Sequence, residues 1–131
     1  MDYATVVPWR TYDDAHGAIA FLETAFGAER HVFETADDGS VAHAELRFGN
    51  GIVMVGSAKP DLPATRGAGA PGEGIYVVVD DIDAHFERAR DAGAEIVSEL
   101  RDLGYSREYS ASDPEDNRWH FGTYQPLAPK T

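Results

Sequence analysis

The hydrophobic and polar positions of the chain follow one order of patterns, and this order occurs twice. In the first half, a strand-like run at residues 5–12 precedes apolar residues at helical spacing, and three more strand-like runs follow. The second half repeats the same order from residue 74 onward. Duplication at this scale is a stronger indication of architecture than any single propensity. The pattern therefore predicts two copies of a strand-helix-three-strand module.

Each predicted helix has an aspartate that can cap its N-terminus and a glycine that ends it. Asp13 and Asp14 precede the first helix, which ends at Gly27, and Asp81 precedes the second, which ends at Gly93. The apolar stripes consist of Ile19, Leu22 and Phe26 in the first helix and of Ile82, Phe86 and Ala89 in the second. Both segments are therefore predicted to be amphipathic helices.

The predicted strands after the helices lie at residues 31–35, 41–48 and 51–57 in the first half and at 95–100, 107–112 and 118–124 in the second. Within the first half, Gly49-Asn50 is typical of a two-residue hairpin turn. Such a turn predicts three pairs of facing residues: Arg47 with Ile52, Glu45 with Met54, and His43 with Gly56. In the last strand, alternation places His120 on the face opposite Trp119 and Phe121, which are predicted to lie in the core.

The length of the chain and one proline-rich segment define its domain organisation. Residues 59–73 contain three of the seven prolines and several glycines, so they read as a linker. A chain of 131 residues suits one domain. We therefore expect a single domain at 1–131, with module one at about 3–58, the linker at 59–73 and module two at about 74–125.

The charge and the cysteine content exclude several function classes. A formal net charge of -12 repels a phosphate backbone and an anionic membrane surface, so neither nucleic acid nor a membrane is an expected partner. The chain has no cysteine, and therefore no disulfide framework, thiolate nucleophile or cysteine metal site. No secretory signal is evident at the N-terminus, and the apolar runs are too short to cross a bilayer. The default expectation is a cytoplasmic protein.

Four phrases of the sequence resemble a known family: "AIAFLETAFGAE", "HAELRFGNGIVMVGS", "YVVVDDIDAHFERARDAGAEIV" and "SREYSASDPEDNRWHFGTY". They are similar to the vicinal oxygen chelate superfamily, which includes glyoxalase, bleomycin-resistance proteins and extradiol dioxygenases, and above all to its uncharacterised glyoxalase-like branch. The resemblance implies an α+β fold of two βαβββ modules whose curved mixed sheets form a cleft, commonly completed in a homodimer. Fold similarity does not by itself define the chemistry.

The resemblance also implies four positions for the metal ligands of the family. These positions fall at Val7, Met54, Gly74 and His120, and only His120 has a side chain that binds a metal. One nitrogen does not hold a divalent ion against water and cellular competition. We therefore expect no metal cofactor.

An alternative is a rebuilt site for one divalent metal ion. If Glu45 faces Met54, then Glu45 and His43 look to the same side of the sheet, and together with His120 they make a His, Glu, His set. Residues 43 and 45 are about 7 Å apart along a strand, so their joint binding of one ion needs favourable rotamers.

Without a metal, the face that carries His120 reads as the wall of a small-molecule site. The residues predicted to line it are Val7, Trp9, Thr11, Ile52, Met54, Tyr76, Val78 and His120. Trp9 and Tyr76 are suited to stack on a planar ligand, and Met54 to adapt to an irregular one. Glu45, Arg47 and Glu108 are candidates for polar contacts, with cross-strand ion pairs as the alternative role.

Three functions remain open from the sequence. The first is a protein of the bleomycin-resistance type that binds or sequesters a small organic molecule. The second is a lyase, isomerase or dioxygenase with a metal held by His120 and Glu45. The third is an enzyme that uses Glu45 or His120 as a metal-free acid or base.

Overall fold

Two four-stranded mixed sheets and two helices form the structure, a computed structural model that describes residues 3–65 and 72–126. Sheet 1 has the strand order β1-β4-β3-β2, and sheet 2 has the equivalent order β5-β8-β7-β6. The elements are β1 (Trp9–Tyr12), α1 (Ala15–Phe26), β2 (Glu29–Thr35), β3 (Val41–Phe48), β4 (Gly51–Ser57), β5 (Ile75–Val78), α2 (Ile82–Asp91), β6 (Glu95–Asp102), β7 (Arg107–Ser112) and β8 (Arg118–Gly122). This is the predicted α+β architecture of two βαβββ modules. The middle of the predicted linker lies outside the described residues.

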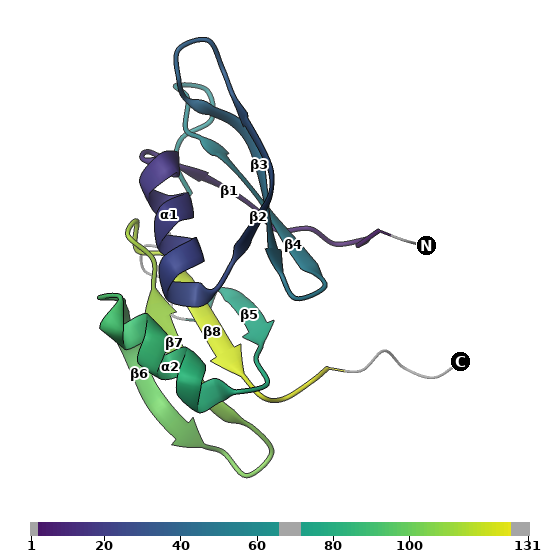
Figure 1. The fold of residues 1–131 in the computed structure, drawn as a ribbon, viewed down its shortest axis with the longest axis vertical. Helices are drawn as coiled ribbons and strands as arrows, with labels where there is room; N and C mark the ends of the chain where they lie inside the picture. Colours follow the sequence, from purple (N-terminus) through teal and green to yellow (C-terminus); the bar gives the residue numbers. More distant parts are fainter. Residues whose placement is uncertain (1–2, 66–71, 127–131) are drawn as a thin grey trace.

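The two modules have the same topology. In each sheet the first and last strands of the module pair in parallel, and the other neighbours pair in antiparallel fashion. Both helices lie on one side of the molecule, and the described segments that lead to the two termini leave it on the opposite side (Figure 1). Each sheet therefore has one face toward the helices and the core and one face away from them, which we call its outer face.

The helix ends follow the predicted signals. The Asp14 side chain accepts a hydrogen bond from the Gly17 N–H, and Gly27 ends α1 with a φ of 80°. The Asp81 side chain accepts from the Ala84 N–H in α2, and Gly93 follows with a φ of 88°. The hairpin register is also as predicted for Arg47 with Ile52 and for Glu45 with Met54.

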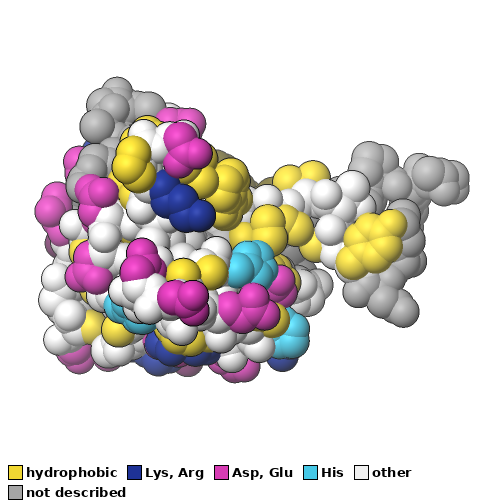
Figure 2. All heavy atoms as spheres, turned by 90° about the horizontal axis from the view of Figure 1, so that it is seen from above, with side chains coloured by type: hydrophobic (Ala, Val, Ile, Leu, Met, Phe, Trp, Pro, Cys, Tyr) yellow, Lys and Arg dark blue, Asp and Glu magenta, His cyan; other side chains and the backbone are white. Residues whose placement is uncertain are grey.

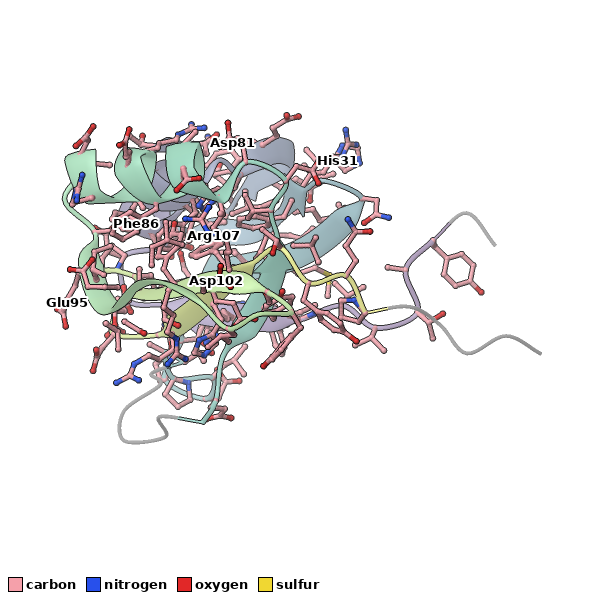
Figure 3. All side chains as sticks on the ribbon, turned by 90° about the horizontal axis from the view of Figure 1, so that it is seen from below. His31, Asp81, Phe86, Glu95, Asp102 and Arg107 are labelled. Carbon is pink, nitrogen blue, oxygen red and sulfur yellow. The ribbon has the colours of Figure 1, made fainter. Side chains whose placement is uncertain are left out.

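A single hydrophobic core joins the two modules. Phe26 of α1 packs against Phe121 of β8, with 4.8 Å between ring centroids, and Phe48 of β3 packs against Trp119 at 5.3 Å. Trp119 and Phe121 are fully buried, as predicted from their alternation with His120. Figure 3 shows Phe86 and Arg107 in the space between α2 and the strands of sheet 2. Because aromatic side chains from both modules interlock, the relative position of the modules in one chain is fixed by packing.

A buried polar network reinforces this core at the turn between β7 and β8. The Asp113 carboxylate accepts hydrogen bonds from the Tyr12 hydroxyl at 2.6 Å and from the Trp119 indole N–H at 3.1 Å. The Glu115 carboxylate accepts from the backbone N–H groups of Asp13 and Asp14, both at 2.8 Å, just before α1. Burial, and the negative charge of Asp113 after it, raise the pKa of Tyr12. The turn of module 2 therefore holds β1 and the start of α1 in module 1.

A second polar contact joins the two helices. The His85 ring bonds through Nε2 to the carbonyl oxygen of Phe26 at 3.0 Å, and Arg88 donates to the carbonyl oxygens of Thr24 and Glu23. These carbonyls belong to the last turn of α1 and have no partner within the helix itself. Side chains of α2 thereby satisfy the end of α1.

The acidic side chains are spread over the surface. Viewed from the end formed by module 1, they are scattered among neutral and apolar side chains (Figure 2). Neither α1 nor α2 is long and apolar enough to cross a bilayer, and the described ranges contain no other helix.

Candidate functional site

The outer face of sheet 1 carries most of the candidate residues from the first module. Along β3, Ala44 and Leu46 are buried in the core, so the intervening side chains of His43, Glu45 and Arg47 belong to the outer face. Residues directly opposite one another share a face, which adds Ile52, Met54 and Trp9 to this surface. The Trp9 side chain is 53% exposed.

The polar side chains on this face are already paired with one another. His43 Nε2 and Glu45 Oε2 are 2.8 Å apart, and the two side chains are partly exposed. Arg47 donates to His31 Nδ1 at 3.0 Å across the β2–β3 pair. Glu45 thus has a neighbour on its own strand and Arg47 has one on β2, and neither contact is the cross-strand ion pair that the sequence left open for them.

The outer face of sheet 2 is hollowed into a cavity of about 480 Å³. Its walls come from module 2 and include Gly74, Tyr76, Val97, Arg101, Glu108, Ser110, Arg118 and His120. Tyr76 and Ser110 lie on either side of His120 in the sheet, since both are direct partners of His120 in the strand register. The wall is largely polar, with Arg101, Glu108 and Arg118 near His120, and its apolar part comes from Val97 and the ring of Tyr76.

His120 is held in one orientation at the centre of this cavity. Its Nδ1 lies 2.6 Å from the Ser110 hydroxyl oxygen. The opposite edge of the ring covers Gly74, where an added Cβ would stand only 2.7 Å from Cδ2 and from Nε2 of His120. Position 74 therefore has no room for a metal-binding side chain while the imidazole occupies this place.

Tyr76 stands beside His120 and is fixed by its hydroxyl group. The hydroxyl donates to the Tyr124 carbonyl oxygen at 2.8 Å, and burial raises the pKa of Tyr76. Its ring crosses Gly122, where an added Cβ would meet the Tyr76 oxygen at 2.5 Å. The side chain remains 36% exposed, so one surface of the ring is available to a ligand.

The structure does not bring the proposed metal set together within one chain. Among the residues it describes, no three His, Asp or Glu side chains lie close enough to hold a metal ion. His43 and Glu45 lie on the outer face of sheet 1, whereas His120 lies on the outer face of sheet 2. The same separation holds for Trp9 and Met54 on sheet 1 and for Tyr76 on sheet 2.

The sequence analysis missed several residues of this cavity, among them Ser110, Arg101 and Arg118. The partner of His120 was accessible in principle, because the strands that contain Ser110 and His120 are joined by a recognisable turn, and its register pairs these two residues. Arg101 had no such local signal, since its place in the cavity depends on the bulged pairing of β6 with β7. Arg118 shares the face of His120 by alternation along β8, which is a local signal.

Comparison with known proteins gives one family. The family model described as Glyoxalase/Bleomycin resistance protein/Dioxygenase superfamily matches residues 4–121. An uncharacterized protein of Mycobacterium bovis is 34% identical over 123 residues, which cover 88% of this chain and 80% of that relative.

Two solved structures are similar over nearly the whole chain. TioX from Micromonospora sp. ML1 is 32% identical with a TM-score of 0.74, covering 97% of this chain and 100% of TioX. TnmS3, an antibiotic binding protein from Streptomyces sp. CB03234, is 18% identical with a TM-score of 0.69, covering 97% of this chain and 99% of TnmS3. At that identity, TnmS3 shows likeness of fold alone.

Proposed function

Because the chain belongs to the Glyoxalase/Bleomycin resistance protein/Dioxygenase superfamily, we propose that it binds a small organic molecule with a planar apolar part, without the usual metal of the family. The ligand contacts Trp9, Met54, Tyr76 and His120, with Glu45 and Arg47 at its edge. In this proposal a second copy of the chain brings the outer face of sheet 1 over the outer face of sheet 2, so the binding unit is a homodimer.

The observation that carries this proposal is the pair of exposed aromatic side chains at equivalent places in the two modules. Trp9 lies directly beside Met54, and Tyr76 lies directly beside His120, each pair joining the first and last strands of its module. Exposed aromatic rings next to adaptable or polar side chains are suited to stack on a planar ligand. A structure of the same fold, TnmS3, is described as an antibiotic binding protein, which is the same kind of role.

The metal-free part of the proposal rests on the side chains at the family positions. Val7 and Met54 provide no hard or borderline donor, and at Gly74 the His120 ring occupies the space of a side chain. His120 then acts as a hydrogen-bonding wall of the cavity, held by Ser110.

The test uses an uncharged aromatic probe, N-phenylnaphthylamine, whose fluorescence rises in an apolar site. We expect the probe to bind saturably, with one site wherever the outer face of sheet 1 covers the outer face of sheet 2. Trp9→Ala and Tyr76→Ala should each lower the affinity for the probe at least tenfold. Tyr105→Ala is the matched control, because Tyr105 is a highly exposed tyrosine in the loop between β6 and β7 and does not line the cavity around His120. Equal affinity of all four proteins would reject the proposed site. Light scattering coupled to size exclusion measures the dimer directly.

A second candidate function, a metal-dependent lyase, isomerase or dioxygenase, is favoured by the His43–Glu45 pair at 2.8 Å. In a dimer that places this pair opposite His120 of the other chain, three acceptable ligands meet one ion. Elemental analysis after incubation with nickel, zinc, manganese and iron tests this function. Near-stoichiometric metal that is lost in His120→Ala would favour the enzyme over the metal-free binder.

A further inference from the structure

Two pockets adjoin at the boundary between the modules. The first has a volume of about 340 Å³ and lies between the start of β1 and the start of β5, with Trp9, Arg10, Gly74 and Arg118 in its wall. The second is the cavity of about 480 Å³ around His120. Gly74 and Arg118 line both, so a ligand in the cavity has a direct neighbour in the junction pocket.

The arginines of these pockets differ from most of the other arginines that the structure describes. Elsewhere four guanidinium groups have polar partners: Arg30 with Glu23, Arg107 with both oxygens of Asp83, Arg88 with helix carbonyls and Arg47 with His31. Arg90 lies over the Phe86 ring instead, 5.2 Å from its centre. Within residues 3–65 and 72–126, by contrast, no side-chain hydrogen bond or ion pair is formed by Arg10, Arg101 or Arg118. Of the four described guanidinium groups without a hydrogen bond or ion pair, three therefore lie at the two pockets, and the fourth, Arg90, packs on Phe86.

The environment of Arg10 is the strongest indication that the junction pocket binds a hydrogen-bond acceptor. Its Nε is buried and has no hydrogen-bond partner among the described residues, while its guanidinium carbon lies 5.6 Å from the centre of the Trp119 ring. A buried charged donor without an acceptor is costly, and such groups in native proteins usually meet a partner, a water molecule or an ion.

The local charge of the pockets is opposite to that of the whole chain. The chain has 23 acidic and 11 basic residues, yet the two pockets place Arg10, Arg101 and Arg118 against two carboxylates, Glu73 and Glu108. Arg101 and Glu108 face each other across the β6–β7 pair without forming an ion pair. The excess of guanidinium groups favours an anion over a cation.

We propose that the adjoining pockets bind an oxyanion, a carboxylate or a phosphate group, through Arg10 and Arg118, with Arg101 at the rim of the cavity. Guanidinium groups bind both kinds of oxyanion through paired hydrogen bonds. The small molecule proposed above therefore carries an acidic group next to its planar part. This last statement rests on the proposed function, whereas the oxyanion site itself does not.

The test is a titration followed by NMR of the arginine side-chain Nε–Hε signals, with inorganic phosphate in one arm and benzoate in the other, at constant ionic strength set with sodium chloride. We expect saturable shifts of the Arg10 and Arg118 signals in at least one arm, and the arm with the stronger binding identifies the kind of oxyanion. Arg118→Gln should weaken this binding at least tenfold. Arg30→Gln, which removes an arginine already paired with Glu23, should leave it unchanged.

Arg10 also packs on Trp119, so replacing Arg10 would disturb the core. The substitution is therefore made at Arg118. Shifts that grow linearly with concentration in both arms, or equal binding by Arg118→Gln and the parent, would overturn the inference. Binding of N-phenylnaphthylamine without binding of either anion leaves the proposed function standing and removes only the oxyanion site. Binding of an anion without binding of the aromatic probe supports the oxyanion site and removes the proposed function.

Discussion

Equivalent backbone positions of module 1 and module 2 carry different side chains. Trp9 beside Met54 in the first module corresponds to Tyr76 beside His120 in the second, in the same parallel pairing of first and last strands. Met54 faces a carboxylate, Glu45, across the antiparallel pair, whereas His120 faces a hydroxyl, Ser110. One outer face is thus an apolar surface with a paired His and Glu, and the other is a cavity centred on an oriented imidazole.

The difference is confined to the outer faces because the inner faces share one core. Residues from both modules interlock around Phe26, Trp119 and Phe121. A close-packed interior constrains side-chain volume in both modules at once, while an outer face is free to change its chemistry. The two modules therefore share a topology and one core, and they differ in the chemistry of their outer faces.

The largest expected effect comes from cutting the polar link between the modules. Asp113→Ala leaves the Tyr12 hydroxyl and the Trp119 N–H buried without their acceptor, together with the backbone N–H groups of Glu115 and Asn117. Unsatisfied buried donors cost about 1–3 kcal/mol each, so we expect the free energy of unfolding to fall by at least about 3 kcal/mol. Urea unfolding measures the loss.

The matched control is Asp37→Ala, which removes an exposed aspartate and should change the stability by less than about 0.5 kcal/mol. An equal effect of the two substitutions would show that the Asp113 network contributes nothing beyond surface charge. A second unfolding transition in Asp113→Ala would show that the modules are separable units.

The next prediction converts the first module toward the second. Met54→His places an imidazole opposite Glu45, whose carboxylate already bonds to His43, so three ligands of borderline character gather on one face. We expect the affinity for Ni²⁺ to rise at least tenfold, about 1.4 kcal/mol. Isothermal titration calorimetry measures this change.

Met54→His combined with Glu45→Gln is the control, because it keeps both histidines and removes the carboxylate. Equal nickel affinity in this double variant and in Met54→His alone would mean that Glu45 does not take part in the new site.

A third prediction uses His85 of α2, at a position where α1 has an alanine. The fourth residue of α1 is Ala18 and that of α2 is His85, whose Nδ1 meets the Tyr109 hydroxyl at 2.6 Å and whose Nε2 meets the Phe26 carbonyl. Burial, and after it the charge of Arg88, lower the pKa of His85, although the carbonyl acts in the opposite direction. The folded state therefore disfavours the protonated ring.

Because the folded pKa is depressed, this contribution to stability is complete above the unfolded value of about 6.5 and is lost as the pH falls through the folded pKa. We expect stability to decrease below about pH 6.5, with a slope from this group of at most about 1.4 kcal/mol per pH unit. Urea unfolding at a series of pH values, compared between the parent and His85→Gln, isolates the effect. Parallel pH profiles of the two proteins would contradict it.

The sequence alone was sufficient to predict the elements that occur in both modules. The capping aspartates, the glycines after the helices and the alternation around His120 each depend on near neighbours in the chain, and the structure confirms them. The hairpin register followed from the length of one turn, which is again a local property.

What the sequence left undetermined depends on contacts between distant segments. The link from Asp113 to Tyr12 spans most of the chain, and the gathering of Arg10 and Arg118 in one pocket requires the two modules to be docked. Periodicity assigns such residues to a face of a strand, and only tertiary packing brings those faces together. The predicted contacts of Trp9, Met54, Tyr76, His120, Glu45 and Arg47 with a ligand remain predictions for this reason.

The smallest expected effect concerns the turns that join the last two strands of each module. Gly49 has a φ of 60° in module 1, and Asp116 has a φ of 66° in module 2. A residue with a Cβ is strained in this left-handed region, although aspartate tolerates it better than most. Asp116→Gly should therefore stabilise the protein by about 0.5 kcal/mol, because the relief of strain exceeds the added entropy of the unfolded chain.

Gly49→Ala, the converse change in the other module, should destabilise the protein by about 1 kcal/mol. Urea unfolding of both variants gives the two signs, and a destabilised Asp116→Gly would mean that the aspartate side chain makes the turn more favourable than its backbone angle suggests.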